Sequence, residues 1–186
     1  MDREKIAAGV RLILEGVGED PDREGLQRTP ERMAEAYEEL FCGLGRPLEE
    51  EIRIYRVENQ DEMIIVKDIP FFSMCEHHLL PFFGHAHIAY IPDNNRITGF
   101  SNLVRVLETA ARRPQLQERL TTEVCEALKK VLEPLGVLVL IEAEHLCMTM
   151  LGVHKPGTRT VTSAMRGYLR KEASRMEALN LIRNGR

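Results

Sequence analysis

The sequence predicts an α+β fold in a single domain. Three observations support this class: apolar residues recur with helical spacing near the N-terminus, β-rich segments follow later in the chain, and further helical segments lie between them. The predicted order is helices, two strands, two helices, two strands and a closing helix, which is an α+β arrangement. A length of 186 residues with 44% hydrophobic residues suits one domain with a real core.

The first two elements are predicted as amphipathic helices. The first carries an apolar stripe of helical period, formed by Ile6, Val10, Ile13, Leu14 and Val17. The second begins with two favourable start signals, Thr29 as N-cap and Pro30 at the first helical position, and the segment CGLGRP ends it. Residues 1–47 are therefore assigned to a helical N-terminal extension and residues 48–186 to the core.

The core is predicted to combine strands and helices. The segments MIIVKDI and AHIAYIP have the composition of strands, joined by a loop rich in Cys and His. Ser101 is the expected cap of a short helix, and a longer helix carries Leu116, Leu120, Val124, Leu128 and Val131. The segment VLVLIEAEHLCMTML is predicted as one or two strands, RTVTSAM as another, and residues 173–183 as a closing helix.

Composition excludes several classes of function. A formal charge of -4 argues against a surface that binds nucleic acid, and the basic stretch 166–186 is interpreted as a solvated helix. No apolar run is long enough to span a membrane, and the N-terminus lacks a secretory signal. Four cysteines do not suggest a disulfide framework. We therefore expect a cytoplasmic protein, where clustered Cys and His more often bind metal.

The segment SMCEHHLLPF carries the first candidate site. Cys75 and His78 have the spacing of two metal ligands, and a third ligand must come from elsewhere. If residues 144–151 are extended, His145, Cys147, Thr149 and Leu151 share one face. Cys75, His78 and Cys147 would form a Cys2His set that leaves tetrahedral zinc an open position for water. Adding His77 or His145 would instead give a closed structural site, and spacing alone leaves both open.

A second candidate site lies in the segment QERLT. Gln117 and Glu118 fall at the start of a predicted helix, where the helix dipole favours a carboxylate. They can therefore be simple cap residues. A Gln-Glu pair also offers both acceptors and a donor to the amide edge of a heterocycle, and this alternative stays open as well.

Several segments together carry a family resemblance. SMCEHHLLPFFG, AHIAYIP, QERLT, HLCM and RTVTSAM occur in an order that resembles GTP cyclohydrolase I, and the likeness runs from about residue 20 to residue 167. This resemblance implies a tunnelling fold (T-fold) for the core, with an antiparallel sheet and helices on one face. It also implies a homodecamer of two stacked pentamers, in which the sheets of neighbouring subunits join into a barrel and active sites lie between subunits.

The resemblance further implies roles for the candidate residues. The positions of Cys75, His78 and Cys147 hold a catalytic Zn2+, and those of His77 and His145 belong to catalytic histidines. The positions of Gln117 and Glu118 hold the guanine ring. The implied reaction opens the purine imidazole ring by attack of water on C8 and releases formate. In the family the ribose then rearranges and closes to 7,8-dihydroneopterin triphosphate.

The sequence departs from the family pattern among the cations that bind triphosphate. The family has Lys where this chain has Glu35, His85 and Asn102, and Arg where it has Leu151. The substrate-binding positions Ser101 and Arg105 are retained, as is Arg32, and Lys155 and Arg159 are further candidate cations. A hydrogen bond to a charged group contributes about 1.5–3 kcal/mol. Loss of several such contacts would weaken a triphosphate ligand by several powers of ten.

These departures determine the function that we expect from sequence. The first expectation is a zinc-dependent hydrolase that opens the imidazole ring of a purine-type base or nucleoside with little or no phosphate, with Leu151 on the pocket wall beside the metal. The alternative is a genuine GTP cyclohydrolase I that gathers its phosphate contacts from other residues. A third hypothesis, a non-catalytic ring-shaped scaffold, is disfavoured by the retained Cys and His residues.

Overall fold

The computed structural model describes residues 1–184 and confirms the α+β class. Arg186, at the end of the basic C-terminal stretch, lies outside the described residues. The chain divides into two compact units between Cys42 and Gly43, and each is described by itself. The predicted boundary between residues 47 and 48 stays a prediction. None of the helices in residues 1–184 combines the length and hydrophobicity needed to cross a bilayer.

The N-terminal unit contains the two predicted helices, α1 (Arg3–Gly16) and α2 (Thr29–Leu40). The carboxylate of Asp2 caps α1 by accepting the backbone N–H of Lys5 at 3.0 Å. The predicted N-cap of α2 is displaced by one residue, because Thr29 is already helical and Arg28 precedes it. Two hydrogen bonds of 2.9 and 2.7 Å from Arg11 to Asp22 tie α1 to the turn that follows it.

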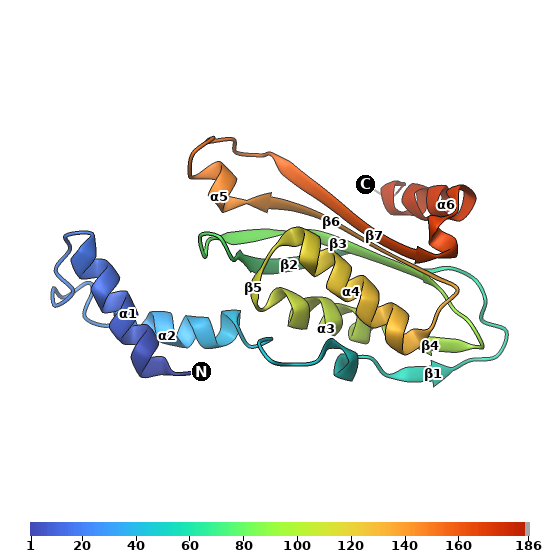
Figure 1. Ribbon diagram of the computed structural model, residues 1–186, viewed down its shortest axis with the longest axis horizontal. Helices are drawn as coiled ribbons and strands as arrows, with labels where there is room; N and C mark the ends of the chain where they lie inside the picture. Colours follow the sequence, from blue (N-terminus) through green and yellow to red (C-terminus); the bar gives the residue numbers. More distant parts are fainter. Residues whose placement is uncertain (185–186) are drawn as a thin grey trace. The chain divides into compact units, whose positions relative to one another are not determined.

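The second unit is built on a five-stranded sheet of order β5-β2-β3-β6-β7 (Figure 1). Its four long strands, β2 (Ile64–Cys75), β3 (Pro81–Ile91), β6 (Gly136–His145) and β7 (Arg159–Gly167), are antiparallel. The two-residue strand β5 (Pro114–Gln115) pairs in parallel with the end of β2. The β2 and β3 strands extend further than predicted, because a bulge between Val66 and Ile69 interrupts the alternation without ending the ladder.

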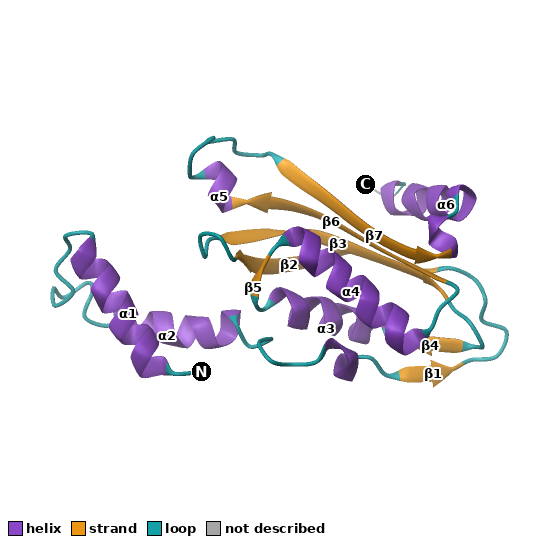
Figure 2. Ribbon diagram, in the orientation of Figure 1, coloured by secondary structure: helices purple, strands orange, loops and turns teal. Residues whose placement is uncertain are grey.

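Two helices, α3 (Phe100–Ala111) and α4 (Gln117–Leu132), cover one face of this sheet (Figure 2). The main core lies between them and the strands, and contains Ile88, Tyr90, Leu103, Leu107, Leu120, Val124, Leu128, Val139 and Ile141. On the opposite face, the predicted closing helix α6 (Glu172–Arg183) packs Ala178 and Ile182 on Ala89 and Leu138. The short helix η2 (Tyr168–Arg170) leads into α6. The predicted sheet with helices on one face is thus confirmed, with α6 added on the other.

Several short elements were not predicted. The helix η1 (Leu48–Glu51) precedes β1 (Ile54–Arg56), which pairs with β4 (Arg96–Thr98) in a separate two-stranded sheet. These segments are too short to show a period in the sequence. Strand β4 leads directly into α3. Helix α3 therefore starts at one end of the five-stranded sheet, and the turn between β2 and β3 lies at the other end (Figure 1).

The prediction that residues 144–151 are extended is wrong. Strand β6 ends at His145, and one helical turn, α5 (Leu146–Thr149), follows it. Two backbone hydrogen bonds close this turn: the N–H of Met150 donates to the Leu146 carbonyl at 2.8 Å, and that of Lys155 to the Met148 carbonyl at 3.1 Å. Leu151 therefore does not share a strand face with Cys147. It lies in the exposed loop beyond α5.

The packing of β3 against β6 predicts a severe effect for Gly84→Ala. A Cβ at position 84 would lie 1.9 Å from the backbone carbonyl oxygen of Glu142, so the two central strands would have to separate. We expect this variant to lose at least about 2 kcal/mol of unfolding free energy, as overpacked sites do. Urea unfolding followed by circular dichroism measures this change.

The matched control is Gly9→Ala, whose added Cβ meets nothing within 4 Å in the helix α1. Because alanine is the better helix former, this control should be neutral or stabilising by up to about 1 kcal/mol. Equal stability of Gly84→Ala and the wild type would contradict the close approach of β3 and β6.

Candidate metal centre and active site

Backbone hydrogen bonds fix the position of Cys75 at the end of β2. Its N–H donates to the Leu80 carbonyl at 2.9 Å, and its carbonyl accepts the N–H of Leu79 at 2.8 Å, which closes the turn to β3. The N–H of Glu76 donates to the Gln115 carbonyl of β5 at 3.0 Å. The turn that carries His77 and His78 is thus attached to the start of α4 through β5.

Three side chains that are remote in sequence meet at this end of the sheet. The ligand atoms of Cys75, His78 and Cys147 all lie within 4.8 Å of one another, with Cys147 supplied by α5. Two sulfurs bound to one tetrahedral zinc at about 2.3 Å are roughly 3.8 Å apart, so a small adjustment seats the ion. The donor set, two soft thiols and one imidazole, suits zinc. Neither His77 nor His145 belongs to this group, as expected for a site with an open fourth position.

The two thiols also show why a cation fits here. Burial raises the pKa of the Cys147 thiol above its ordinary value, and the nearby Cys75 raises it further. A second thiolate would therefore form beside the first only at a cost in free energy. A divalent ion removes that repulsion and favours the thiolate form of both side chains.

His145 lies beside this group and is held by two contacts. Its ring stacks on Phe82, its cross-strand partner on β3, with centroids 4.6 Å apart and an interplanar angle of 1°. Its Nε2 lies 2.7 Å from Oε1 of Gln117. Burial lowers the pKa of His145, while the carboxylate of Glu118 opposes that shift. His77, in contrast, is exposed on the turn, with its ring perpendicular to that of His78 at 6.4 Å.

The two candidate residues in the first turn of α4, Gln117 and Glu118, differ in burial. Gln117 is buried, with 1% of its surface exposed, whereas Glu118 is exposed at the helix N-terminus. The next residue, Arg119, donates to the carboxylate of Glu76 and to Oε1 of Gln115 at 2.8 Å. Sequence reasoning missed Arg119 and Phe82. The acidic Glu76 between two metal-type residues was a signal that a cation lies nearby.

Other predicted site residues lie away from the metal group within one chain. Ser101 is in the first turn of α3 and Arg105 in its middle, and the end of that helix leads to β5. The ten residues from Ser101 to Ala111 span roughly 15 Å of helix. Arg105 itself donates to Oδ1 of the buried Asn102 and lies 3.7 Å from the carboxylate of Glu51. Leu151 is 41% exposed on its loop, and its place on the pocket wall stays a prediction.

The fold and this site together define an α+β protein with a candidate Cys2His metal centre. The family model for GTP cyclohydrolase I matches residues 6–183 of this chain. Sequence comparison gives relatives of nearly equal length that are described as GTP cyclohydrolase 1. The relative from Carboxydothermus hydrogenoformans is 57% identical over 98% of this chain and 95% of its own length. The relative from Clostridioides difficile is 56% identical over 98% of this chain and 97% of its own length. The chain belongs to the GTP cyclohydrolase I family, so the resemblance, the hydrolase class and the family's tunnelling fold are confirmed.

A further relative described as GTP cyclohydrolase 1, from Caldanaerobacter subterraneus, is 54% identical and covers all of both chains. Among solved structures, the archaeosine synthase QueF-Like in its apo form is similar to 56% of this chain and 93% of its own, at 18% identity and a TM-score of 0.45. The family assignment rests on the sequence matches.

The donor set predicts that zinc binding depends on Cys147. Cys147→Ala removes one of two sulfurs, so this variant should retain less than about a tenth of the zinc that the wild type holds after dialysis. Atomic absorption on the purified proteins measures the stoichiometry. Cys42→Ala is the matched control, since Cys42 is exposed and outside the donor group, and it should bind zinc normally. Full zinc content in Cys147→Ala would contradict the ligand set.

Proposed function

We propose that this chain is a GTP cyclohydrolase I that hydrolyses GTP to formate and 7,8-dihydroneopterin triphosphate. The observation that carries the proposal is the 57% identity, along 98% of the chain, to a relative described as GTP cyclohydrolase 1. The convergence of Cys75, His78 and Cys147 supports it, because this group is suited to the Zn2+ that the chemistry requires.

This proposal replaces our first expectation, a substrate with little or no phosphate. That expectation depended on the substitutions at Glu35, His85, Asn102 and Leu151, and the structure bears on the last two. Asn102 is buried and accepts a hydrogen bond from Arg105, so it orients a retained cation. Leu151 is on an exposed loop and not on the Cys147 strand face that we expected. Neither position therefore argues strongly against a triphosphate, and the similarity to the relatives favours GTP. The scaffold hypothesis is not supported, since the family is one of hydrolases.

The chemistry that we propose divides among a few side chains. Zinc, when bound by Cys75, His78 and Cys147, supplies the Lewis acidity that activates water for attack on C8 of the purine. His77, which is exposed and next to His78 in the chain, is the proposed group that exchanges protons with a ring nitrogen of the substrate. His145 serves as the second proton-transfer group from the wall of the site. Glu118, exposed at the start of α4, is the candidate to accept hydrogen bonds from the guanine edge.

A second copy of the chain would have to complete this site. Ser101 lies in the first turn of α3 and Arg105 in the middle of that helix, whereas the end of α3 leads to β5 beside the metal group, so we propose that they bind the triphosphate of a neighbouring subunit's site. This placement is consistent with the predicted homodecamer, which, like the cytoplasmic location, stays a prediction.

The proposal predicts the substrate. Zinc-loaded protein incubated with GTP should form 7,8-dihydroneopterin triphosphate, detected after oxidation by its pterin fluorescence, with one formate per GTP. Guanosine and guanine, which lack the phosphates, should react at least about a hundredfold more slowly, because several charge-assisted contacts of about 1.5–3 kcal/mol each are lost. Faster turnover of guanosine or guanine than of GTP would restore the first expectation and overturn this one.

The proposal also predicts a specific role for His77. His77→Ala should keep its zinc but lose about two orders of magnitude or more in kcat, because general acid–base catalysis contributes about 10²–10⁴-fold. His154→Ala, an exposed histidine on the loop beyond α5, is the matched control and should keep full activity. If His77→Ala loses zinc together with activity, His77 is a ligand and our assignment is wrong.

A further inference from the structure

The side-chain amide of Gln117 has its orientation fixed by its neighbours. Its Nε2 lies 3.1 Å from the Ile141 carbonyl, 3.0 Å from the Thr160 carbonyl and 3.1 Å from Oγ1 of Thr162. Backbone carbonyls only accept hydrogen bonds, so the NH2 group must face them and the flipped amide is excluded. Both N–H donors of the buried amide are therefore committed inside the protein.

This orientation determines which nitrogen of His145 carries a proton. Oε1 of Gln117 faces Nε2 of His145 at 2.7 Å, and an amide oxygen can only accept. Nε2 must therefore be the N–H donor in the neutral ring, as it is in the charged ring. All proton exchange by His145 is then restricted to Nδ1.

The plane of the ring is fixed independently by Phe82. The two rings are parallel to within 1° at a centroid distance of 4.6 Å, and they belong to directly paired residues of β3 and β6. Stacking prevents tilting of the imidazole, and the hydrogen bond to Gln117 prevents its rotation within that plane. His145 is thus held with a defined tautomer and a defined direction of Nδ1.

We propose that Gln117 is a positioning residue that orients His145, and that it does not read the purine. The side chain that we expected to bind the heterocycle has no donor left for it, whereas Glu118 is exposed next to it. The catalytic part of this inference rests on the proposed function. The tautomer of His145 is a property of the folded protein and can be tested without turnover.

The decisive experiment measures the tautomer directly. Solid-state 15N spectra of zinc-loaded protein labelled in its six histidines distinguish the two nitrogens, and the His145 signals are assigned by their loss in His145→Phe. We expect the wild type to be protonated at Nε2, and Gln117→Met, which keeps the length of the side chain but not its acceptor, to contain a substantial Nδ1–H population. A wild-type ring protonated mainly at Nδ1 overturns the proposal, whether or not Gln117→Met folds.

Kinetics separate positioning from substrate binding. Gln117→Met should lower kcat for GTP about 10–100-fold, as loss of an orienting partner does, with KM changed less than about threefold. Glu118→Gln, the matched change at the neighbouring residue, should raise KM and leave the tautomer unchanged. A large rise in KM for Gln117→Met with an unaltered tautomer would show that Gln117 binds the purine. If the wild type does not turn over GTP, the proposed function fails while the spectra still decide the role of Gln117.

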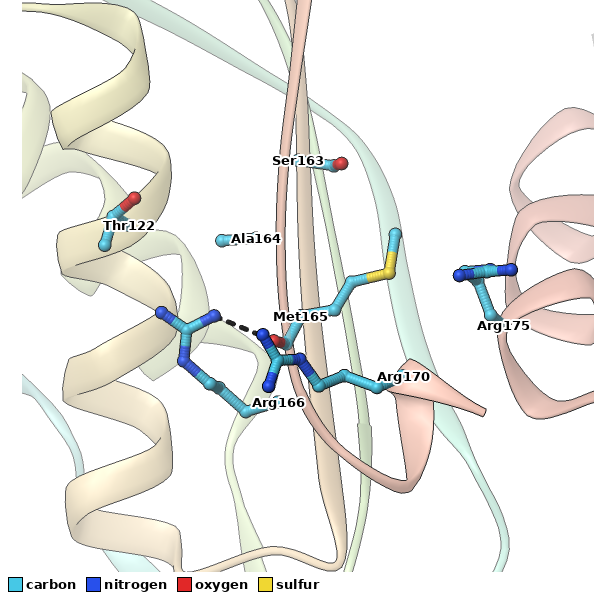
Figure 3. A pocket seen from close by; sticks show the side chains of 7 residues that line it. All are labelled: Thr122, Ser163, Ala164, Met165, Arg166, Arg170 and Arg175. Atoms are coloured by element: carbon cyan, nitrogen blue, oxygen red, sulfur yellow. Dashed lines mark hydrogen bonds between the residues drawn. The ribbon is translucent and has the colours of Figure 1, made fainter. Parts of the chain in front are cut away.

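An independent observation concerns the basic C-terminal stretch, which lines a cavity. A cavity of about 380 Å³ is bordered by Arg166, Arg170 and Arg175, which come from β7, η2 and α6 (Figure 3). Thr122 and Ser163 add hydroxyl groups to its lining. Arg166 pairs in register with Val137, near the start of β6, whereas the metal group lies beyond the end of that strand. Eight residues at about 3.3 Å each place the cavity roughly 26 Å from that end.

The charges of this cavity are only partly compensated. Arg166 is held by Glu126, to which its Nε donates at 2.6 Å, and its Nη1 donates to the Met165 carbonyl at 2.8 Å. Within residues 1–184, Arg170 and Arg175 form no ion pair. A chain with a net charge of -4 thus concentrates three guanidinium groups around one cavity.

We infer that this cavity binds a small anion that carries phosphate groups. Guanidinium groups bind phosphate oxygens in a bidentate manner, and hydroxyls complete such sites. The wild-type protein should bind inorganic pyrophosphate in a calorimetric titration. The double variant Arg170→Gln/Arg175→Gln should bind it at least about tenfold more weakly, because it loses two charge-assisted contacts. Arg183→Gln, on the same helix α6 but outside the cavity, is the matched control.

Two results would overturn this anion site. One is equal affinity of the wild type, the double variant and the control for pyrophosphate, since binding would then be elsewhere. The other is no binding to the wild type, together with a changed sedimentation coefficient of the double variant, since the arginines would then contact another copy of the chain.

Discussion

The first turn of α4 joins two strand ends that the sheet itself keeps apart. β3 lies between β2 and β6, so the backbones that lead to Cys75 and Cys147 are about 10 Å apart. Arg119 holds Glu76, the neighbour of Cys75, and Gln117 holds His145, two residues before Cys147. Both contacts come from one helix whose hydrophobic side is anchored in the core by Leu120 and Val124. The metal donors are thereby placed before any ion binds.

The same turn bears on whether the proposed zinc centre is structural or catalytic. A closed Cys2His2 site would need a second imidazole, and His145 is the obvious candidate by sequence. Gln117 engages its Nε2, and Phe82 fixes its plane, so His145 is kept beside the donor group and outside it. In the function that we propose, the fourth position of a bound zinc is left for water and His145 is left for proton transfer.

The sequence predicted the long helices and strands and the three donors, but not the short elements or how the donors meet. Helical and alternating periods were enough for α1, α4 and β7. Residue type and spacing made Cys75, His78 and Cys147 candidates, and the family resemblance selected them over a closed set with His77 or His145. The local pattern HLCMTML fits a strand and a helical turn equally well, so α5 and the true place of Leu151 could not be predicted. The side-chain amide of Gln117 donates to the carbonyls of residues that are 24 and 43 positions away in the chain, and no local sequence pattern predicts such long-range hydrogen bonds.

X-ray absorption at the zinc edge tests the central claim most directly, because it counts the ligands of the bound ion in the intact protein. An open catalytic centre predicts two sulfur scatterers at about 2.3 Å and a single imidazole, with a light atom from water in the remaining position. Two sulfurs with two imidazoles would mean that His145 or His77 closes the site, and would contradict the account in which Gln117 keeps His145 free for catalysis.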